Sequence, residues 1–336
     1  MSQNQLWMSF LKTSALSVLL LTVVVAIFNF LVNPYNLFCK VCAEPRQAES
    51  NHQRLYKMVD LLRYQPKHLL LGTSRVDYGI DGTRLTPQPY YNAGLSDASM
   101  TEIFSLLKAA DRIAGLEKVV LFLDISSFDE SDNQGAQDFR LSLGRDVGWR
   151  GLGEYYIAKT ASAVLSLDAI LASIEVLLTT DQHCIGTRYY GQAQAQDKAC
   201  SASQSGRKEA FMEVAQRLAE NKYGRAGIDH LQRGLAIFDS ILEYCRTHNI
   251  DLQLVYPPVH DEVLNIARSL SLTPAFPQWK VSIDNHIANS SKKSWQSSLQ
   301  SKDLTSIAGV TDEVVAEQMH YWWEASHFKP EVKFAL

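Results

Sequence analysis

The chain has 336 residues, of which 46% are hydrophobic and 20% are charged, and its formal net charge is −4. This length and apolar content are enough for one substantial core, in one or two domains. Lys and Arg are scattered without a basic stripe, so the charge pattern does not favour nucleic acid as a partner.

The first predicted element is an N-terminal helix. Residues 13–32 carry no formal charge, with Asn29 as the one strongly polar interruption, and Asn33-Pro34 ends the run. The run is long enough to cross a bilayer as one helix. It is longer than the apolar core of a signal peptide, and no small-residue cleavage site follows it. We therefore predict an uncleaved membrane anchor over 1–34 and regard a buried core helix as the alternative.

The charges that flank this run bear on its orientation. Lys12 precedes it, whereas Lys40 and Arg46 follow it. The positive-inside rule gives a slight preference for a cytoplasmic N-terminus. Residues 35–336 would then form a periplasmic domain tethered to the inner membrane.

Five cysteines are compatible with an oxidising compartment. Cys184 and Cys200 flank a polar stretch and could close a loop as a disulfide. Cys39 and Cys42 form a C-x-x-C pair that lacks the second pair of a zinc site and the strand-helix setting of a redox motif. A local disulfide or two thiols is the favoured interpretation there, and Cys245 is expected in the core.

Strands and helices alternate after the anchor. Predicted strands cover residues 68–71, 90–93, 118–124 and 252–256, and predicted helices cover 100–114, 229–248, 260–270 and 277–289. The first of these helices has Ser99 or Thr101 as its cap and Glu102 in its first turn. The alternation predicts a single α/β domain over 35–336 with a flavodoxin-like parallel sheet.

Residues 127–224 interrupt this pattern. The stretch 158–178 is apolar and typical of a helix, whereas 182–206 is polar and contains many turn formers. We predict a helical insertion that lies over the carboxyl edge of the sheet.

Two short motifs carry the chemistry. Gly72-Thr73-Ser74-Arg75 stands at the end of the first strand, where ligands of open α/β sheets bind. A helix N-cap is the competing interpretation of this motif, since serine and threonine are favoured caps. In Glu324-Ala325-Ser326-His327, a carboxylate three residues before a histidine can orient the imidazole towards a serine. Together the motifs predict a nucleophile, Ser74, with a remote Glu324–His327 pair.

These blocks, with Asn92-Ala93-Gly94 after the second strand, resemble the SGNH (GDSL-like) hydrolase superfamily. The resemblance covers most of residues 69–336 and is nearest to a membrane-anchored envelope branch that acts in O-acetylation or D-alanylation of extracellular polymers. It implies that Ser74 attacks an ester, that His327 is the general base and that Glu324 orients it. It also implies an oxyanion hole formed by the N–H groups of Ser74 and Gly94, with a further donor from Asn92 or a polar group after the third strand.

The chain departs from the family pattern at three places. Thr73 replaces the aspartate of Gly-Asp-Ser, and Glu324 replaces the usual aspartate before histidine. Asp124-Ile125-Ser126-Ser127 stands where the family has Gly-x-Asn-Asp, so the asparagine donor of the oxyanion hole is missing. Glutamate still serves to orient histidine in other serine hydrolases.

Further polar and aromatic residues have two interpretations each. Arg75 either holds an anionic substrate group or pairs with Asp77 or Asp81, and the pairing is favoured. For the aromatic run 321–323, core packing is favoured over a platform for sugar rings. His260 follows a strand and is expected to be solvated rather than to line the cleft.

No His, Cys, Asp or Glu cluster has metal-ligand spacing and no Gly-rich loop matches a phosphate cradle, so neither metal nor cofactor is expected. The favoured function is serine-dependent acyl-ester chemistry, as O-acetyl transfer or ester hydrolysis, on an extracytoplasmic glycan or exopolysaccharide. A membrane acyl-donor partner would supply the transfer reaction. The alternatives are a catalytically inactive scaffold or polymer-binding component of an envelope assembly, and a lipid-directed esterase.

Overall fold

A computed structural model describes residues 3–35, 37–38, 53–85, 88–130, 149–178, 188–189, 192–193, 207–271, 274–295 and 298–332. The predicted disulfide between Cys184 and Cys200 and the C-x-x-C pair of Cys39 and Cys42 lie outside these ranges. Cys245 is a buried free thiol, as expected for a core position. Burial raises its pKa to about 12.

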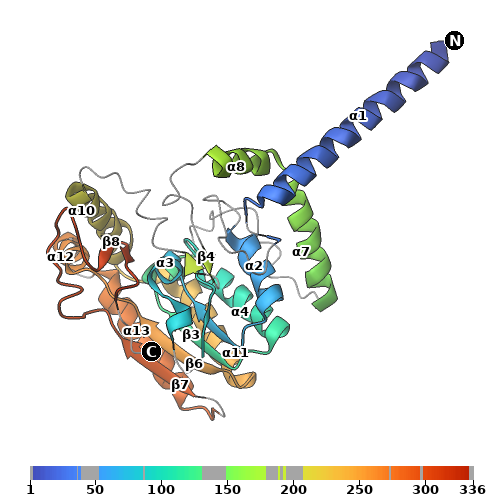
Figure 1. Ribbon diagram of the computed structural model, residues 1–336. Coiled ribbons are helices and arrows are strands. Elements are labelled where there is room, and N and C mark those ends of the chain that lie inside the picture. Colours follow the sequence, from blue (N-terminus) through green and yellow to red (C-terminus); the bar gives the residue numbers. More distant parts are fainter. Residues whose placement is uncertain are drawn as a thin grey trace.

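The N-terminal helix α1 (Gln3–Val32) projects away from the rest of the chain (Figure 1). It is long and apolar enough to cross a membrane, and 6% of its most apolar window is buried. A core helix would be wrapped by other elements on all sides, so that alternative is wrong. Among the described residues of α1, only Asn29 is buried.

The sheet has five parallel strands in the order β2-β1-β3-β6-β7. Their bounds are β1 (His68–Leu71), β2 (Tyr91–Asn92), β3 (Lys118–Phe122), β6 (Asp251–Tyr256) and β7 (Leu299–Asp303). This is the strand order of flavodoxin-like doubly wound sheets, as predicted. Such sheets bind ligands outside the carboxyl ends of β1 and β3, where the order reverses.

The predicted strands are confirmed with small changes at their ends, but the edge strand β7 was not predicted. Its sequence, Leu-Gln-Ser-Lys-Asp, is mostly exposed and has no apolar alternation. A polar, charged edge discourages pairing with another chain, which explains why such a strand lacks the usual pattern. A second missed element is the antiparallel hairpin of β8 (Trp322–Glu324) and β9 (His327–Phe328).

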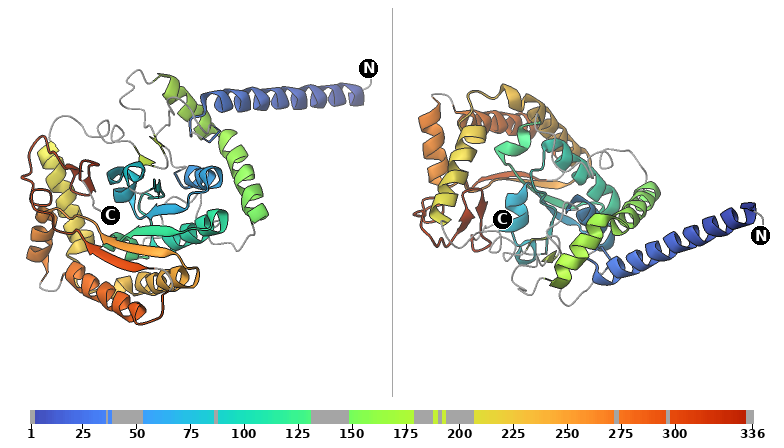
Figure 2. Two further views of the ribbon diagram at one scale, coloured as in Figure 1. Left: turned by 60° about the horizontal axis from the view of Figure 1, so that its bottom comes forward. Right: turned by 90° about the horizontal axis from the view of Figure 1, so that it is seen from above.

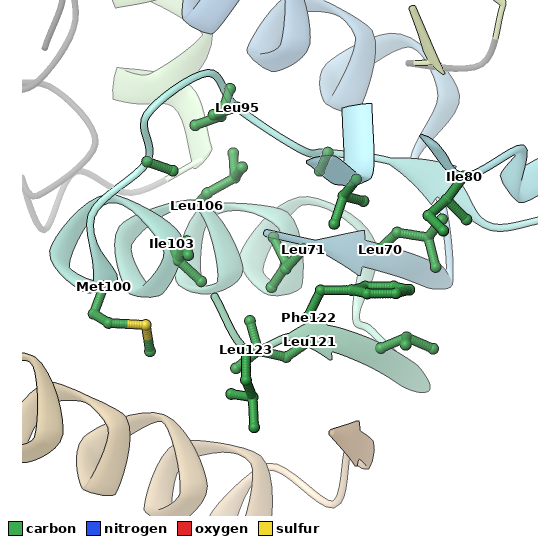
Figure 3. Close-up of a cluster of buried hydrophobic side chains, with 14 of the residues drawn as sticks. Leu70, Leu71, Ile80, Leu95, Met100, Ile103, Leu106, Leu121, Phe122 and Leu123 are labelled. Atoms are coloured by element: carbon green, nitrogen blue, oxygen red, sulfur yellow. The ribbon is translucent and has the colours of Figure 1, made fainter. Parts of the chain in front are cut away.

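Helices cover the sheet, and Figure 3 shows the part of the hydrophobic core that lies around β1, β3 and α4. The helices outside the predicted insertion are α2 (Gln53–Tyr64), α3 (Ser74–Gly79), η1 (Gly82–Arg84), α4 (Met100–Ala114), η4 (Asp229–Leu231), α11 (Gln232–Thr247), α12 (Asp261–Leu270) and α13 (Ala275–Ser291). Helix α4 has the predicted bounds, with Ser99 as N-cap and Glu102 completing a capping box. Leu71, Leu106 and Phe122 are among the buried side chains of this core.

The described part of the predicted insertion is mainly helical. Its elements are α5 (Ile125–Phe128), α7 (Trp149–Val164), α8 (Leu167–Leu178), β4 (Arg188–Tyr189), β5 (Gln192–Ala193), α10 (Arg207–Leu218) and the π-helical turn η3 (Ala219–Tyr223). The stretch 158–178 is helical, as predicted, but it divides between α7 and α8, which are bent by 65° at the break between them. The Ser166 hydroxyl accepts a hydrogen bond from the Ala169 N–H at 3.1 Å and so starts a new helix.

The two described ends of this insertion lie on different sides of the domain. Helices α7 and α8 lie with α1 on one side, whereas α10 lies with α12 and the β8–β9 hairpin on the other (Figures 1 and 2). The described part of the insertion therefore divides between α1 and the region of the hairpin.

Candidate active site

Ser74 follows β1 at a tight turn. A side chain at Gly72 would place its Cβ 2.5 Å from Val76 Cγ2, so the close approach of α3 to the strand requires glycine. Thr73, not Ser74, is the N-cap of α3, because its hydroxyl accepts the Arg75 N–H at 3.3 Å. Ser74 is half-buried as the first residue of the helix, and its side chain has a different partner. The N-cap interpretation of the motif is therefore confirmed for Thr73, but Ser74 is not the capping residue.

That partner is His327. Ser74 Oγ lies 2.7 Å from His327 Nε2, although the two residues are 253 positions apart in the chain. On its other side, His327 Nδ1 hydrogen-bonds Glu324 Oε1. The structure thus brings together the serine, histidine and carboxylate that the two sequence motifs predicted, in the order of a catalytic triad.

Ser326 belongs to the same cluster. Its hydroxyl lies 2.6 Å from Glu324 Oε1 and 2.7 Å from His327 Nδ1, and its N–H donates to Glu324 Oε2 at 2.8 Å. Burial alone would raise the pKa of Glu324, but the hydrogen bonds and charge of His327, with those from Ser326, lower it to about 2. The carboxylate is ionised at neutral pH and can orient the imidazole.

The β8–β9 hairpin reaches Ser74 because it packs on α3. The Phe328 ring lies against Gly79, where any side chain would collide with it. The Tyr78 ring meets His327 edge-on, with ring centroids 5.4 Å apart. Trp322 is buried, and its indole N–H donates to the Val310 carbonyl at 2.7 Å. For Trp322, the core interpretation of the aromatic run is confirmed.

Arg75 is buried beside the serine. Its guanidinium Nη1 lies 3.4 Å from Asp124 Oδ2 and donates to the Tyr223 hydroxyl at 3.2 Å, and Nη2 donates to the Pro258 carbonyl. Burial alone would raise the pKa of Asp124, but the charge of Arg75 and hydrogen bonds from Ser126 lower it below the usual value. Arg75 is therefore a fixed positive charge next to Ser74.

The expected partners of Arg75 were wrong. Asp77 instead forms an ion pair with Lys57 at 2.8 Å, with both side chains fully buried. Asp81 pairs with Arg84 at 2.8 Å. The predicted pairing was based on neighbours in sequence, whereas the carboxylate that meets Arg75 follows a different strand.

Asn92 and Gly94 are not brought to the serine hydroxyl as oxyanion donors. The Gly94 N–H donates to Asn92 Oδ1 at 3.0 Å, and the Asn92 amide donates to the carbonyls of Val76 and Ile80 at 2.8 and 2.9 Å. A Cβ at Gly94 would lie 2.9 Å from the Thr73 carbonyl oxygen. These residues hold the turn behind Ser74, so the donors predicted for the oxyanion hole are used within the fold.

A cavity of about 140 Å³ opens over the triad. Its walls include Ser74, Arg75, Ser126, Tyr223, Ser326 and His327. A neighbouring polar hollow of about 490 Å³ shares Asp97, Ser126, Leu218 and Lys222 with it. The two spaces therefore share part of their walls.

Several lining residues were not predicted. Lys222 and Tyr223 come from the π-helical turn η3, and nothing in their sequence spacing marks them. Single π-turns occur often at functional sites, but the sequence does not reveal them. Ser126 was detectable, because it follows the third strand at the same sheet edge as Ser74.

His260 has a structural role and does not line the cavity. It is 1% exposed, it caps α12 by accepting the Glu262 N–H, and its Nε2 hydrogen-bonds the Glu313 carbonyl at 2.9 Å. The expectation that it is solvated is therefore wrong. Its ring packs between Phe211 and Trp322.

Within the part of the chain that the structure describes, no group of three His, Cys, Asp or Glu side chains could hold a metal ion. The chemistry that this arrangement can perform is nucleophilic attack by a hydroxyl activated through an oriented imidazole. Compared with known proteins, the chain matches no family model and no curated sequence.

Proposed function

We propose that the chain is a serine-dependent acyl-ester enzyme of SGNH type, which removes or transfers a short acyl group carried on an extracytoplasmic glycan. One observation carries the proposal: Ser74 Oγ lies 2.7 Å from His327 Nε2, while Glu324 binds the opposite nitrogen of the same ring. A buried imidazole held between a hydroxyl and an ionised carboxylate is the arrangement that activates serine nucleophiles.

The reaction has two balanced halves. Ser74 Oγ attacks the acyl carbonyl carbon while its proton passes to His327 Nε2. The ester C–O bond then breaks, and the imidazolium returns the proton to the departing alkoxide. In the second half, His327 takes a proton from water or from an acceptor hydroxyl while that oxygen attacks the acyl carbon. The bond between Ser74 Oγ and the acyl carbon then breaks, and the imidazolium returns the proton to Ser74 Oγ.

When Ser74 attacks the ester, the carbonyl oxygen becomes negatively charged. Groups other than Gly94 and Asn92 must stabilise this charge. We assign this role to the Ser74 N–H at the start of α3. The hydroxyl of Ser126 stands where the resembling family carries its asparagine donor, but it donates to Asp124 Oδ1 at 3.0 Å and is used within the fold. Arg75 adds a positive charge that its buried hydrogen bonds hold in place. Fixed donors and charges of this kind are usually the largest contribution to catalysis.

The size and polarity of the two spaces support the substrate class. The cavity of about 140 Å³ over Ser74 is small beside the roughly 300–1,000 Å³ of pockets for drug-sized ligands, so a short acyl group fits it best. The adjoining hollow pairs Lys222 with Asp97 and Arg225 with Asp129. Paired charges and hydroxyls suit a neutral polyhydroxylated chain such as a glycan.

A fluorophosphonate probe tests the proposal on the full-length chain in membranes. We expect labelling of the wild type, no labelling of Ser74→Ala, and unchanged labelling of Ser240→Ala, which removes an exposed hydroxyl on α11. Acetyl esters should then be cleaved faster than esters of long acyl chains. Equal labelling of Ser74→Ala and wild type would show that another residue reacts.

The use of Gly94 and Asn92 within the fold favours a second candidate, a scaffold that binds polymer without catalysis. In that case the wild type would resist the probe and show no esterase activity, while acetylated polysaccharide would still bind it. Preferential cleavage of long-chain lipid esters would instead point to the lipid-directed esterase.

A further inference from the structure

The membrane helix α1 is fixed to the insertion by a buried polar joint. The Asn29 side chain is fully buried; its amide donates to the Val164 carbonyl at 2.7 Å, and its oxygen accepts the Ser173 hydroxyl at 2.8 Å. Val164 ends α7 and Ser173 lies in α8. The joint therefore holds the short helix α8 against the last turns of α1 (Figure 2).

The position of this joint along α1 places α8 at the membrane boundary. The uncharged run of residues 13–32 rises about 30 Å at 1.5 Å per residue, which matches the hydrocarbon thickness of a bilayer. Asn29 lies three residues before Val32, or about 5 Å inside the end of that run. Any element hydrogen-bonded to Asn29 is held at the level where acyl chains meet headgroups.

Helix α8 has two opposite faces. Ala169, Ser173 and Val176 are buried towards the protein. The opposite face carries four exposed apolar side chains at helical spacing, Leu167 (77% exposed), Leu171 (66%), Ile174 (41%) and Leu178 (73%). The acidic side chains of Asp168 and Glu175 are exposed along one flank of this apolar face. An exposed apolar face opposite one packed on the protein is the property that α8 shares with helices that lie in a membrane interface.

We infer that α8 lies in the plane of the membrane interface, with the face of Leu167, Leu171, Ile174 and Leu178 buried among lipid acyl chains. Lipid is the favoured occupant because α8 packs on the last turns of α1, which themselves expose the apolar side chains of Ile27, Phe30 and Leu31. The surface that meets lipid around α1 therefore continues onto α8.

This second contact goes beyond the proposed function, since it concerns how the domain sits on the bilayer. A domain attached through α1 alone could swivel about its tether. With α8 embedded, two elements joined at Asn29 fix one orientation of the domain against the membrane. Amphipathic helices of this type reach about 5–10 Å into the interface, which agrees with the depth of the joint.

Photocrosslinking of the full-length chain tests the inference. A diazirine amino acid in place of Leu171 is irradiated in vesicles of phosphatidylethanolamine and phosphatidylglycerol, and adducts are identified by mass spectrometry. We expect a phospholipid adduct at this position. Val281 on α13 is the matched control, because it is 62% exposed on a helix on the opposite side of the domain and should give no such adduct (Figure 1).

A second pair of variants carries the diazirine amino acid in place of Leu178. One has no further change, and the other also carries Leu171→Glu and Ile174→Glu. These exposed positions leave the core intact, so the charged pair should abolish the lipid adduct while α1 keeps the chain in the membrane. An adduct at Leu171 to a second copy or to another protein would overturn the inference. Equal lipid adducts at Leu171 and Val281, or none at either, would overturn it as well.

Discussion

At the scale of single residues, the tautomer and orientation of the His327 imidazole depend on the groups around its Nδ1. Glu324 and Ser326 both hydrogen-bond this nitrogen, and Tyr78 packs against the ring edge. With the Nδ1 proton bound by the carboxylate, the neutral ring presents its Nε2 lone pair to Ser74. The orientation and tautomer of the ring are thus set by Glu324, Ser326 and Tyr78.

Replacing Glu324→Gln should lower kcat/KM for an acetyl ester by about 10³–10⁴-fold, because an amide does not hold the required tautomer. The wild-type fold should persist, as shown by an unchanged circular dichroism spectrum. Glu331→Gln, at an exposed position near the end of the described chain, is the control and should keep full activity. A rate that survives Glu324→Gln would remove this carboxylate from the mechanism.

The pKa of Glu324 also links stability to pH. Its folded-state pKa of about 2 lies below the usual value of 4.5. The ionised carboxylate therefore stabilises the fold fully above pH 4.5, and this contribution of about 3 kcal/mol is lost as the pH falls towards 2. Urea unfolding of wild type and Glu324→Gln should show the two free energies of unfolding converging on acidification. If the free energies of unfolding of the two proteins changed in parallel with pH, the result would contradict a lowered pKa of Glu324.

At the scale of elements, the site depends on ion pairs and packing between α3, β3, η3 and the β8–β9 hairpin. The Arg75–Asp124 pair joins the helix after β1 to the segment after β3, and Tyr223 of η3 completes it. Both charged side chains are buried, so neither can lose its partner without a large cost.

Arg75→Ala should therefore lower the free energy of unfolding by about 3–5 kcal/mol, since Asp124 becomes a buried unpaired charge. Adding Asp124→Asn should restore part of this loss, as a double-mutant cycle in urea would measure. If the losses in free energy of unfolding from the two single substitutions simply added in the double variant, Arg75 and Asp124 would not be coupled.

Gly79→Ala should disrupt the docking of the hairpin on α3, because the added methyl group meets the Phe328 ring. His327 precedes Phe328, so the expected result is loss of probe labelling at Ser74 together with a lower melting temperature. The double variant Gly79→Ala with Phe328→Leu should regain part of the labelling, because the smaller side chain makes room. Wild-type labelling of Gly79→Ala would contradict the proposed fit.

At the scale of the whole molecule, Asn29 connects the apolar helix α1 to the domain. Asn29→Leu removes both hydrogen bonds of the joint and leaves Val164 and Ser173 without their partner in α1. Amide hydrogen exchange in nanodiscs should become faster in α8 while β1 and β3 keep their protection. The control Thr22→Val, on the exposed surface of α1, should leave amide exchange unchanged both in α8 and in β1 and β3. Unchanged exchange in α8 after Asn29→Leu would show that the joint does not hold it.

The sequence by itself determined the elements with strong local patterns. The uncharged run of α1, the buried apolar strands β1, β3 and β6, and the capped helix α4 each follow from residues close together in the chain. The same is true of the choice of Ser74, Glu324 and His327, because the type and spacing of these residues limit their chemistry. The polar edge strand β7 and the break between α7 and α8 have no such pattern.

Only the tertiary structure decided which distant groups meet. The partner of Arg75 is Asp124 rather than the nearby Asp77, and Gly94 donates to Asn92 rather than into the cavity. The physical reason is that a parallel sheet gathers the ends of strands from remote parts of the chain at one edge. The partner of a buried charge or hydrogen-bond donor therefore depends on this topology, and it cannot be predicted from spacing along the sequence.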